Sequence, residues 1–409
     1  MKRVLRTLAA AALAVSLAGC AAGQTPGNGG TSEPGASGGD EKYRIGVLLG
    51  LTGAYAAVSE PQQRALEIIE ESVNGAGGIN GRDIEFIYLD TESDETKAVN
   101  QLRRMALQEN VIGVLGPSSS GEGLALKPVV GSLSLPTIAI ASNRQITEPA
   151  DPFMFREFPS NTDAAAAQLA YAKSQGWERV AVISSNNAYG QEGADAVAAL
   201  AESEYGLTLV GSEVFAPDAT DVTAQLSVLA NADPDVLLVW AVSPANAIVA
   251  RNAVDSGFPG MIFQGTGAAA TAYIELGGPA AEGTILVGSK ILVPEDLDSS
   301  DPQYDVVIDF VEQWRNAFGT DPNQFASGAW DAALIMLEAL EKGDIDPSNV
   351  EQARLDLRDS LENNVKSLQG TNAVYDFSAD RHGPQGIDGL AVMGVEGGKF
   401  RLISGELGG

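Results

Sequence analysis

Residues 111–130, VIGVLGPSSSGEGLALKPVV, contain the pattern that decides the fold of this chain. An apolar run, Val111–Leu115, is followed by Gly116-Pro117 and then by three consecutive serines. Apolar residues return at helical spacing from Glu122 to Val130. A short apolar run bounded by Gly and Pro predicts a buried strand, and the second run predicts a helix. The stretch is therefore one strand–loop–helix unit.

The same alternation continues on both sides of this stretch. Around it the sequence predicts strands at Tyr43–Leu49, Asp83–Leu89 and Thr137–Ala141, and helices at Gln62–Val73 and Thr96–Gln108. Strands that alternate with helices at this spacing form βαβ units, whose strands run parallel in one sheet. The first part of the chain is therefore predicted to be an α/β unit.

A second series of strands and helices begins after residue 160. Its predicted strands are Arg179–Ser184, Leu207–Val214, Val236–Val242 and Met261–Gln264, and its predicted helices are Thr162–Gln175, Gln191–Glu204, Val222–Ala230 and Ala245–Ser256. An apolar segment, three more helices and a hairpin follow, at Ile285–Val293, Gln303–Phe318, Ala326–Glu341, Val350–Leu361, Leu390–Val395 and Lys399–Ile403. The restart of the pattern favours two α/β domains.

Length and composition agree with two domains and exclude several function classes. The 409 residues are too many for one ordinary core. The 25 basic residues are outnumbered by 54 acidic ones, so the net charge of −29 argues against binding to nucleic acid or anionic lipid. One Cys and one His exclude a disulfide framework and make a metal site improbable. No nucleophile elbow or phosphate-binding loop is present, so we expect no enzyme and no cofactor.

The N-terminus is predicted to be an export signal. Lys2, Arg3 and Arg6 precede an apolar run, Thr7–Ala18, that is too short to span a bilayer. The run ends in Leu17-Ala18-Gly19-Cys20, which resembles the lipobox of bacterial lipoproteins. This resemblance implies a signal peptide at 1–19 and a lipid on Cys20; the alternative is a structural Cys after an ordinary signal. Gly, Ser, Thr and Pro dominate the stretch to residue 41, which predicts a flexible tether.

Seven motifs, in order and at matching spacing, give the chain a family resemblance. They are Leu51–Tyr55 (LTGAY), Asn74–Arg82 (NGAGGINGR), Asp90–Val99 (DTESDETKAV), Gly113–Ser120 (GVLGPSSS), Tyr189-Gly190, Ala329–Ala332 (AWDA) and Asp376-Phe377 with Asp380. Together they resemble the extracytoplasmic solute-binding proteins of ABC transporters, in the leucine/isoleucine/valine-binding branch of type I periplasmic binding proteins. The resemblance covers residues 43–403.

The resemblance implies a fold of two Rossmann-like, doubly wound lobes, joined by three crossovers, with a ligand cleft between them. The first lobe would comprise residues 42–159 and 290–377, and the second residues 160–289 and 378–409. The crossovers would form a hinge near Glu157–Ser160, Ser289–Leu292 and Phe377–Ser378. Ligands of open α/β sheets bind at the carboxyl ends of the strands, where the motif loops are predicted.

The resemblance also implies the residues that bind the ligand. Hydroxyls and backbone N–H groups at a helix start can hold a carboxylate, and the position of Ser120 does so in the family, with Ser119 beside it. Ala141 and Ser142 would complete the carboxylate and ammonium contacts. Without the resemblance, the serines could simply cap the helix, and Ala141 and Ser142 could form a plain turn.

The second lobe is expected to contribute a wall to the same cleft. Tyr189 would offer an apolar face and one hydroxyl, although the residue type and position also suit a core aromatic. Tyr55 is placed near a wall position of the first lobe, and Thr266 with Gly267 on a loop of the second lobe. Ser243 occupies a family tyrosine position, which makes the pocket less aromatic.

Thr266 is the informative departure from the family. Leucine-binding relatives have a Glu at this position, which pairs with the ligand ammonium, whereas a threonine hydroxyl is neutral. A buried, unpaired ammonium would cost several kcal/mol. Either another acid supplies the charge, with Glu122 and Asp331 as candidates, or the ligand has no ammonium.

Three further residues are predicted from the sequence to have no direct role in ligand binding or catalysis. Trp240 is predicted to lie in a core, and Trp330 in a core or on a lid of the cleft. His382 is predicted to be a surface or hinge histidine without a catalytic role.

The function expected from all this is a lipid-anchored binding protein of an ABC importer. It would be a monomer outside the cell membrane and would close two lobes around a small solute for permease and ATPase subunits. A branched-chain or related amino acid is the first candidate. A small carboxylate, an aromatic acid, an amide or urea is the alternative, as is a sensor that feeds a receptor.

Overall fold

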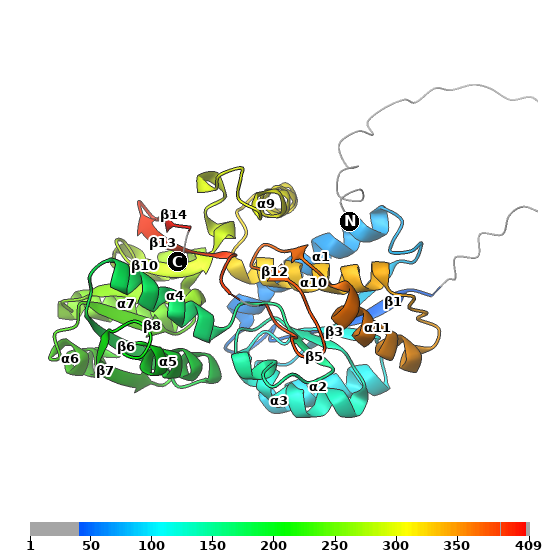
Figure 1. Cartoon of the computed structure of the whole chain (residues 1–409), viewed down its shortest axis with the longest axis horizontal. Coiled ribbons are helices and arrows are strands. Elements are labelled where there is room, and N and C mark those ends of the chain that lie inside the picture. The colour runs from blue at the N-terminus through cyan, green and yellow to red at the C-terminus, as the bar shows by residue number, and fades with distance from the viewer. Residues whose placement is uncertain (1–40, 385, 406–409) are drawn as a thin grey trace, which may run out of the picture.

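The structure is a computed structural model that describes residues 41–384 and 386–405. Two separate main sheets divide it into two lobes that lie side by side in Figure 1, the second lobe mostly in green on the left. The predicted signal peptide, Cys20 and the tether up to residue 40 lie outside the described residues.

The first lobe is built on a parallel sheet with the strand order β2-β1-β3-β4-β5. Its strands are β1 (Tyr43–Leu49), β2 (Ile84–Asp90), β3 (Gly113–Leu115), β4 (Thr137–Ala139) and β5 (Met154–Arg156). Strand β1 is apolar on both faces, as strands covered by helices on two sides must be. Ile45 and Val47 pack into one core cluster and Leu48 into the cluster on the opposite face.

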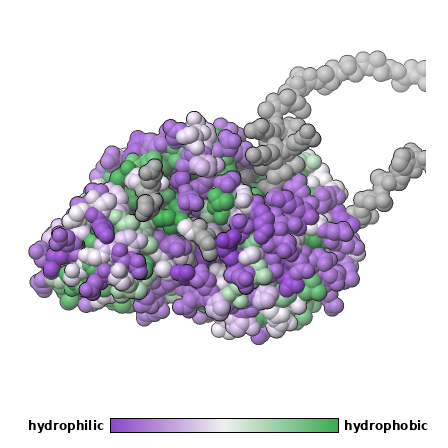
Figure 2. Space-filling model, in the orientation of Figure 1, coloured by the Kyte–Doolittle hydropathy of each residue, from purple (hydrophilic) through white to green (hydrophobic). Residues whose placement is uncertain are grey.

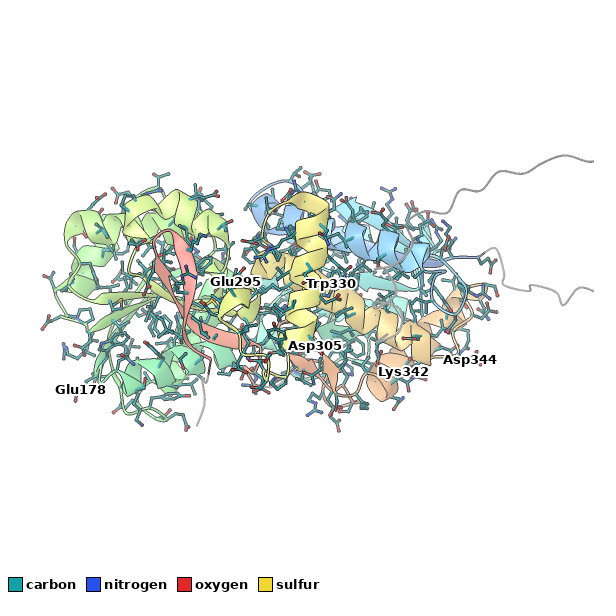
Figure 3. All side chains as sticks on the ribbon, turned by 90° about the horizontal axis from the view of Figure 1, so that it is seen from above. Glu178, Glu295, Asp305, Trp330, Lys342 and Asp344 are labelled. Atoms are coloured by element: carbon teal, nitrogen blue, oxygen red, sulfur yellow. The ribbon has the colours of Figure 1, made fainter. Side chains whose placement is uncertain are left out.

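Six helices of the described chain belong to the first lobe. They are α1 (Ala56–Gly75), α2 (Glu95–Leu107), α3 (Ser120–Val130), α9 (Tyr304–Phe318), α10 (Gln324–Lys342) and α11 (Val350–Asn364). Helix α10 is buried on all sides from Ala326 to Leu340, so it is the inner helix of the lobe. Seen from above in Figure 3, α9 crosses over it, and the Phe310 ring lies 4.6 Å from Trp330. The core role predicted for Trp330 is confirmed.

The second lobe has a mixed sheet with the strand order β14-β13-β10-β9-β8-β6-β7. Its strands are β6 (Arg179–Ser185), β7 (Thr208–Phe215), β8 (Val236–Trp240), β9 (Met261–Gln264), β10 (Ile285–Ser289), β13 (Leu390–Glu396) and β14 (Lys399–Ser404). The helices are α4 (Asn161–Ser174), α5 (Ala188–Leu200), α6 (Thr223–Ala230), α7 (Ala245–Ser256) and α8 (Thr271–Gly277). Strands β6, β7, β8, β9 and β10 run parallel. The final hairpin adds two antiparallel strands, β13 and β14.

The chain passes between the two lobes three times. It crosses after β5 into α4, returns after β10 into α9, and crosses again between β12 (Val374–Tyr375) and β13. Strand β12 pairs only with β11 (Leu368–Gln369), in a small ribbon beside α10. The predicted α/β fold of two lobes is confirmed.

Two short elements of the structure were not predicted from the sequence. Strand β5 has three residues and α8 has seven, and neither is long enough for a hydrophobic period to show. The apolar segment predicted at 285–293 divides into strand β10 and a 3-10 turn at Lys290–Leu292. The division falls at Ser289, whose hydroxyl accepts a hydrogen bond from the Ile291 N–H and so starts the turn.

The prediction of a surface position for His382 is wrong, although the residue does lie beside the last crossover. The side chain is buried, with the residue only 1% exposed, and its ring stacks on Phe155 at 4.1 Å. Its Nδ1 lies 2.7 Å from the carbonyl oxygen of Asp151 and 3.1 Å from that of Met154. His382 therefore packs the crossover onto β5, a long-range contact that its local sequence does not reveal.

Most of the face in Figure 2 is hydrophilic, in keeping with the excess of acidic side chains. Hydrophobic residues gather there mainly in the left and central part. None of the described helices is both long and apolar enough to cross a membrane.

Candidate ligand site

One cavity lies between the two lobes, and residues of both line it. Its empty volume is about 530 Å³, including the part that is open to solvent. All eight residues that the sequence proposed for ligand binding line this cavity: Tyr55, Ser119, Ser120, Ala141, Ser142, Tyr189, Thr266 and Gly267. Ten further lining residues were not among those eight: Val58, Gln62, Ser118, Ile140, Glu157, Phe158, Val242, Gln324, Phe325 and Gly328.

The three serines that start α3 have different roles. Ser119 is the helix cap: its hydroxyl accepts a hydrogen bond from the Glu122 N–H at 3.2 Å and donates to the Glu122 carboxylate at 2.7 Å. The hydroxyl of Ser118 donates to Gln62 and lies 2.8 Å from the hydroxyl of Ser59. Among the described residues, the Ser120 hydroxyl has no hydrogen-bond partner. The start of α3 therefore offers the cavity a hydroxyl and helix N–H groups, which suit an anion.

Ala141 and Ser142 follow the carboxyl end of β4, the strand that lies next to β3 in the sheet. Both are buried and line the cavity. The carbonyl of Ser142 accepts a hydrogen bond from the Asn161 N–H at 2.9 Å, which fixes the backbone of this turn. The Ser142 hydroxyl makes no hydrogen bond to another described residue, so it remains available beside the start of α3.

Tyr189, on α5, holds the loop of Thr266 and Gly267 in place. Its hydroxyl accepts a hydrogen bond from the Gly267 N–H at 2.7 Å and lies 3.2 Å from the Thr266 hydroxyl. The ring packs 5.4 Å from that of Trp240, whose predicted core position is confirmed. Burial raises the pKa of Tyr189 to about 12. Tyr189 thus stays protonated, forms a wall of the cavity and orders its second-lobe loop.

Gln324 connects the two lobes directly beside the cavity. It opens α10 in the first lobe, and its amide donates to the Thr266 carbonyl at 2.9 Å and accepts from the Ser289 N–H at 2.8 Å. Sequence reasoning missed this residue. The local signal was a helix start after Asn323, which says nothing about the loops of the other lobe that Gln324 contacts.

Glu157 is the acidic residue among the described residues that line the cavity, and the sequence assigned its segment only to the hinge. It follows β5 and is 1% exposed, and its Oε2 makes no hydrogen bond to a described residue. Burial, followed by the nearby Asp331 carboxylate, raises the pKa of Glu157 well above its ordinary value, and Arg156 and Asn372 oppose this shift.

Neither of the two acids considered as partners for a ligand ammonium lines the cavity. The Asp331 carboxylate is fully buried and accepts hydrogen bonds from four groups: Thr371 N–H, Thr371 Oγ1, Asn372 N–H and the Tyr375 hydroxyl. Glu122 is buried behind Ser119, to which it is bonded. In the described part of the chain, no group of three His, Cys, Asp or Glu side chains is arranged to hold a metal ion.

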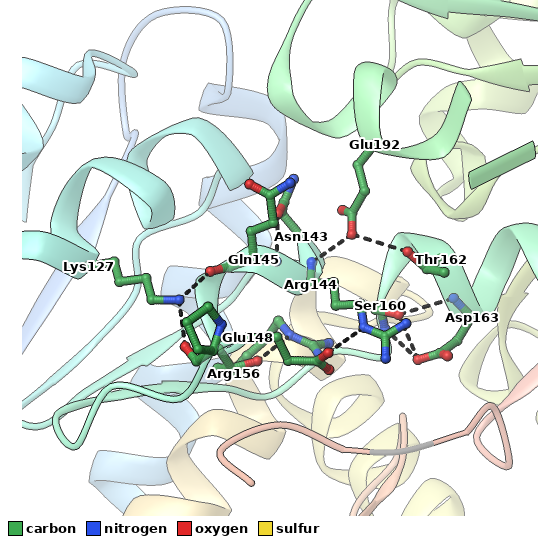
Figure 4. Close-up of polar contacts among 12 residues, drawn as sticks. Lys127, Asn143, Arg144, Gln145, Glu148, Arg156, Ser160, Thr162, Asp163 and Glu192 are labelled. Carbon is green, nitrogen blue, oxygen red and sulfur yellow. Dashed lines mark hydrogen bonds and ion pairs between the residues drawn. The ribbon is translucent and has the colours of Figure 1, made fainter. Parts of the chain in front are cut away.

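A second set of contacts joins the lobes at the edge of the cavity. Figure 4 shows the Glu192 carboxylate of α5 facing the backbone of Arg144 in the first lobe, where the Arg144 N–H donates at 2.7 Å. The other oxygen of Glu192 accepts from the Asn161 amide at 2.6 Å, and Thr162 lies alongside. Asn143 adds a hydrogen bond to the Ala188 carbonyl at 3.2 Å. The lobes are therefore in direct contact next to the candidate site.

Comparison with known proteins identifies relatives over nearly the whole described chain. Residues 42–399 match the family of periplasmic binding proteins. The chain is 25% identical over 381 residues to Leu/Ile/Val-binding protein homolog 7 of Brucella melitensis, covering 88% of this chain and 90% of that protein.

Solved structures agree with this assignment. An extracellular ligand-binding receptor from Rhodopseudomonas palustris HaA2 superimposes with a TM-score of 0.81 at 25% identity, covering 88% of this chain and 99% of that one. The substrate-binding protein LivJ of a branched-chain amino acid transporter from Streptococcus pneumoniae has the same fold, with a TM-score of 0.75 at 19% identity and coverage of 88% and 98%.

These matches test two expectations from the sequence: what kind of protein the relatives are, and to which family the chain belongs. The relatives are binding proteins of an extracytoplasmic family rather than enzymes, as expected. With a two-lobed fold, a cavity between the lobes and a family match over residues 42–399, the chain belongs to the periplasmic binding protein family.

Proposed function

We propose that this protein captures a small solute, most simply a branched-chain or related amino acid, and delivers it to an ABC importer. The observation that carries the proposal is the convergence of eight residues from both lobes on one cavity. The match to a Leu/Ile/Val-binding protein homolog supports the amino-acid class. Pockets of this volume, with apolar walls and a few polar groups, are typical of small-molecule sites.

The ligand carboxylate would bind at the start of α3, to Ser120, Ser142 and the helix N–H groups. The first lobe, residues 42–159 with 290–377, would contact the ligand first. The second lobe, residues 160–289 with 378–409, would then close over it through Tyr189. Closure is a population shift, because the ligand contacts both lobes only in the closed state.

The same proposal places the protein at the outer face of the cell membrane. The lipid would be attached to Cys20, and residues 20–41 would tether the binding body. Permease and ATPase subunits would recognise the closed monomer. Mass spectrometry of membrane-extracted protein tests this part: Cys20→Ala should abolish the lipid and release the protein from the membrane.

Screening by thermal shift tests the ligand class. Binding to the folded state raises the melting temperature by mass action, in proportion to the logarithm of ligand concentration over Kd. We expect a subset of apolar amino acids to raise the melting temperature of residues 41–409. If leucine, isoleucine and valine all fail while small carboxylates, aromatic acids, amides or urea succeed, the amino-acid assignment is wrong and the transport role stands.

Removal of two hydroxyls tests the carboxylate site. Ser120→Ala combined with Ser142→Ala should weaken binding of the identified ligand about 100-fold or more, because hydrogen bonds to a charged group contribute about 1.5–3 kcal/mol each. Isothermal titration calorimetry measures the change. The matched control is Ser203→Ala with Ser256→Ala, which removes two exposed hydroxyls bonded to their own helices. Equal affinity in both double variants would remove these serines from the site.

A further inference from the structure

An unpaired acid faces the candidate site. The Glu157 carboxyl lines the cavity and is buried, yet its Oε2 has no hydrogen-bond partner among the described residues. Buried carboxyls are ordinarily paired or hydrogen-bonded, since an unmatched one costs several kcal/mol. Such an arrangement persists at sites where a ligand supplies the missing partner.

No described side chain forms an ion pair with Glu157, although Arg156 and Asn372 lower its pKa in part. The adjacent Arg156 directs its guanidinium away, donating to the Phe158 carbonyl and, at 3.4 Å, to the Thr147 hydroxyl. Asp331 on α10 and Tyr375 on β12 also face this region, and both add negative rather than positive potential when ionised. Among the described residues that line the cavity, there is no Lys, Arg or His. A positive charge opposite Glu157 would therefore have to come from the ligand.

The space for the Glu157 carboxyl depends on a glycine of the opposite helix. Gly328 lies on α10 and also lines the cavity. A Cβ at this position would lie 2.9 Å from Oε1 of Glu157 and 3.2 Å from the side chain of Ile140. Glycine is unfavourable inside a helix, and at this position it leaves the room that the acid occupies.

We propose that Glu157 binds the ammonium group of the ligand, and that the ligand is therefore a zwitterionic amino acid with its carboxylate at the start of α3. This inference rests on the proposed function, which it narrows to one ligand class. Glu157 would supply from the first lobe the negative charge that Thr266 cannot supply from the second. The Thr266 loop carries no charge: the Tyr189 hydroxyl accepts a hydrogen bond from the Gly267 N–H and lies 3.2 Å from the Thr266 hydroxyl.

A proton-linked binding reaction follows from this arrangement. Because burial and Asp331 raise the pKa of Glu157, the empty site favours the protonated acid. Pairing with an ammonium favours the carboxylate, so binding releases a proton to solvent. Affinity for an amino acid should then rise with pH through the range in which Glu157 of the empty protein loses its proton. The charged groups that set this range are Asp331 and Arg156, and the neutral Tyr375 hydroxyl also faces Glu157.

Matched ligand pairs and one isosteric variant test the inference. The probes are the twenty amino acids and, for each one that binds, the same molecule without the ammonium, such as 4-methylpentanoate for leucine. Wild type should bind the amino acid at least about 10-fold more tightly than its pair, and Glu157→Gln should lose about 10- to 100-fold for the amino acid only. Calorimetry in buffers of different ionisation enthalpy should show proton release by wild type and none by the variant.

Two comparisons separate ligand binding from a structural role. Glu157→Gln should be about as stable as wild type, because it replaces a buried carboxyl that has an unpaired oxygen with a neutral amide of the same shape, whereas replacing a structural acid would cost stability. Glu70→Gln is the control: it removes a partly buried carboxyl whose pKa burial also raises, on the outer helix α1. That variant should keep both the affinity and the proton release.

Three outcomes would contradict the inference, and they differ from failure of the proposed function. They are equal affinity of wild type and Glu157→Gln for an amino acid, unchanged proton release in the variant, and binding restricted to solutes that carry no cation. In each of these cases the protein still binds a solute in the cavity. If no amino acid, carboxylate or amide binds at all, the proposed function itself is wrong.

Discussion

Asp331→Ala should lower the free energy of unfolding at neutral pH by about 3–5 kcal/mol, as expected when a buried carboxylate network loses its acceptor. The carboxylate accepts four hydrogen bonds, two of them from the backbone N–H groups of Thr371 and Asn372. Without it these donors are buried and unpaired, and each costs about 1–3 kcal/mol before relaxation. Urea unfolding followed by circular dichroism measures the change.

Asparagine should not rescue this position. Each oxygen of Asp331 accepts from one backbone N–H, and an amide has only one acceptor atom, so its NH₂ group would face a donor. Glu312→Ala is the control, because it removes an exposed carboxylate from α9. A loss of less than about 1 kcal/mol in Asp331→Ala, close to that of the control, would show that the network does not anchor the third crossover.

The stability difference should also depend on pH. Burial raises the pKa of Asp331 from its ordinary 3.8 to about 6, against the effect of its hydrogen bonds. Between these values the folded state binds more protons at this site than the unfolded chain does. The contribution is therefore complete below about pH 4 and is lost as pH rises through 6, an effect of up to about 3 kcal/mol. The gap between wild type and Asp331→Ala should widen as pH falls from 7 to 4.

The sequence determined most of the fold because the long elements have clear periods. Strand β1, strand β9 and helix α7 have the predicted bounds, and α3 differs only by starting at Ser120 instead of Glu122. The serine run caused that difference, since Ser119 is the cap and the helix begins immediately after it. Strand β5 is held by three residues of pairing to β4, a contact that its own composition does not encode.

The site residues that could be predicted are those whose position follows from the neighbouring strand in the sequence. Ser120 and Ser142 lie within five residues after the ends of β3 and β4, so the predicted strands placed them at the carboxyl edge of the sheet. Glu157, Gln324 and Gly328 could not be found in this way. Glu157 and Gly328 are 171 positions apart and meet only because α10 returns to the first lobe.

The same limit explains why Asp331 was a candidate partner for a ligand ammonium. From the sequence it is an acid in a family motif on a helix, which is compatible with either a ligand contact or a structural role. Its partners lie about forty residues later, in the turn between β11 and β12. Only the folded chain shows that the turn occupies both oxygens. Among the described residues that line the cavity, the acid with an unpaired oxygen is then Glu157, whose local sequence indicated only a crossover.

Glu192→Ala should weaken ligand binding about 10-fold or more by favouring separation of the lobes. The carboxylate belongs to α5 of the second lobe and accepts a hydrogen bond from the Arg144 backbone of the first lobe, so the contact exists only while the lobes are together. A hydrogen bond to a charged acceptor contributes about 1.5–3 kcal/mol. Loss of this free energy lowers the population of the closed state, which is the state that binds the ligand. The apparent Kd rises by the same factor.

Glu192 lies outside the cavity wall, so its removal separates lobe closure from ligand contact. Small-angle X-ray scattering without ligand should show a larger radius of gyration for Glu192→Ala, and saturating ligand should restore the wild-type value. Asp195→Ala is the matched control, since it removes an exposed carboxylate from the same helix. Glu192→Gln should lie between wild type and Glu192→Ala, because its amide oxygen can still accept from Arg144. An unchanged radius together with an unchanged Kd would mean that closure is set by the crossovers and by Gln324 rather than by this contact.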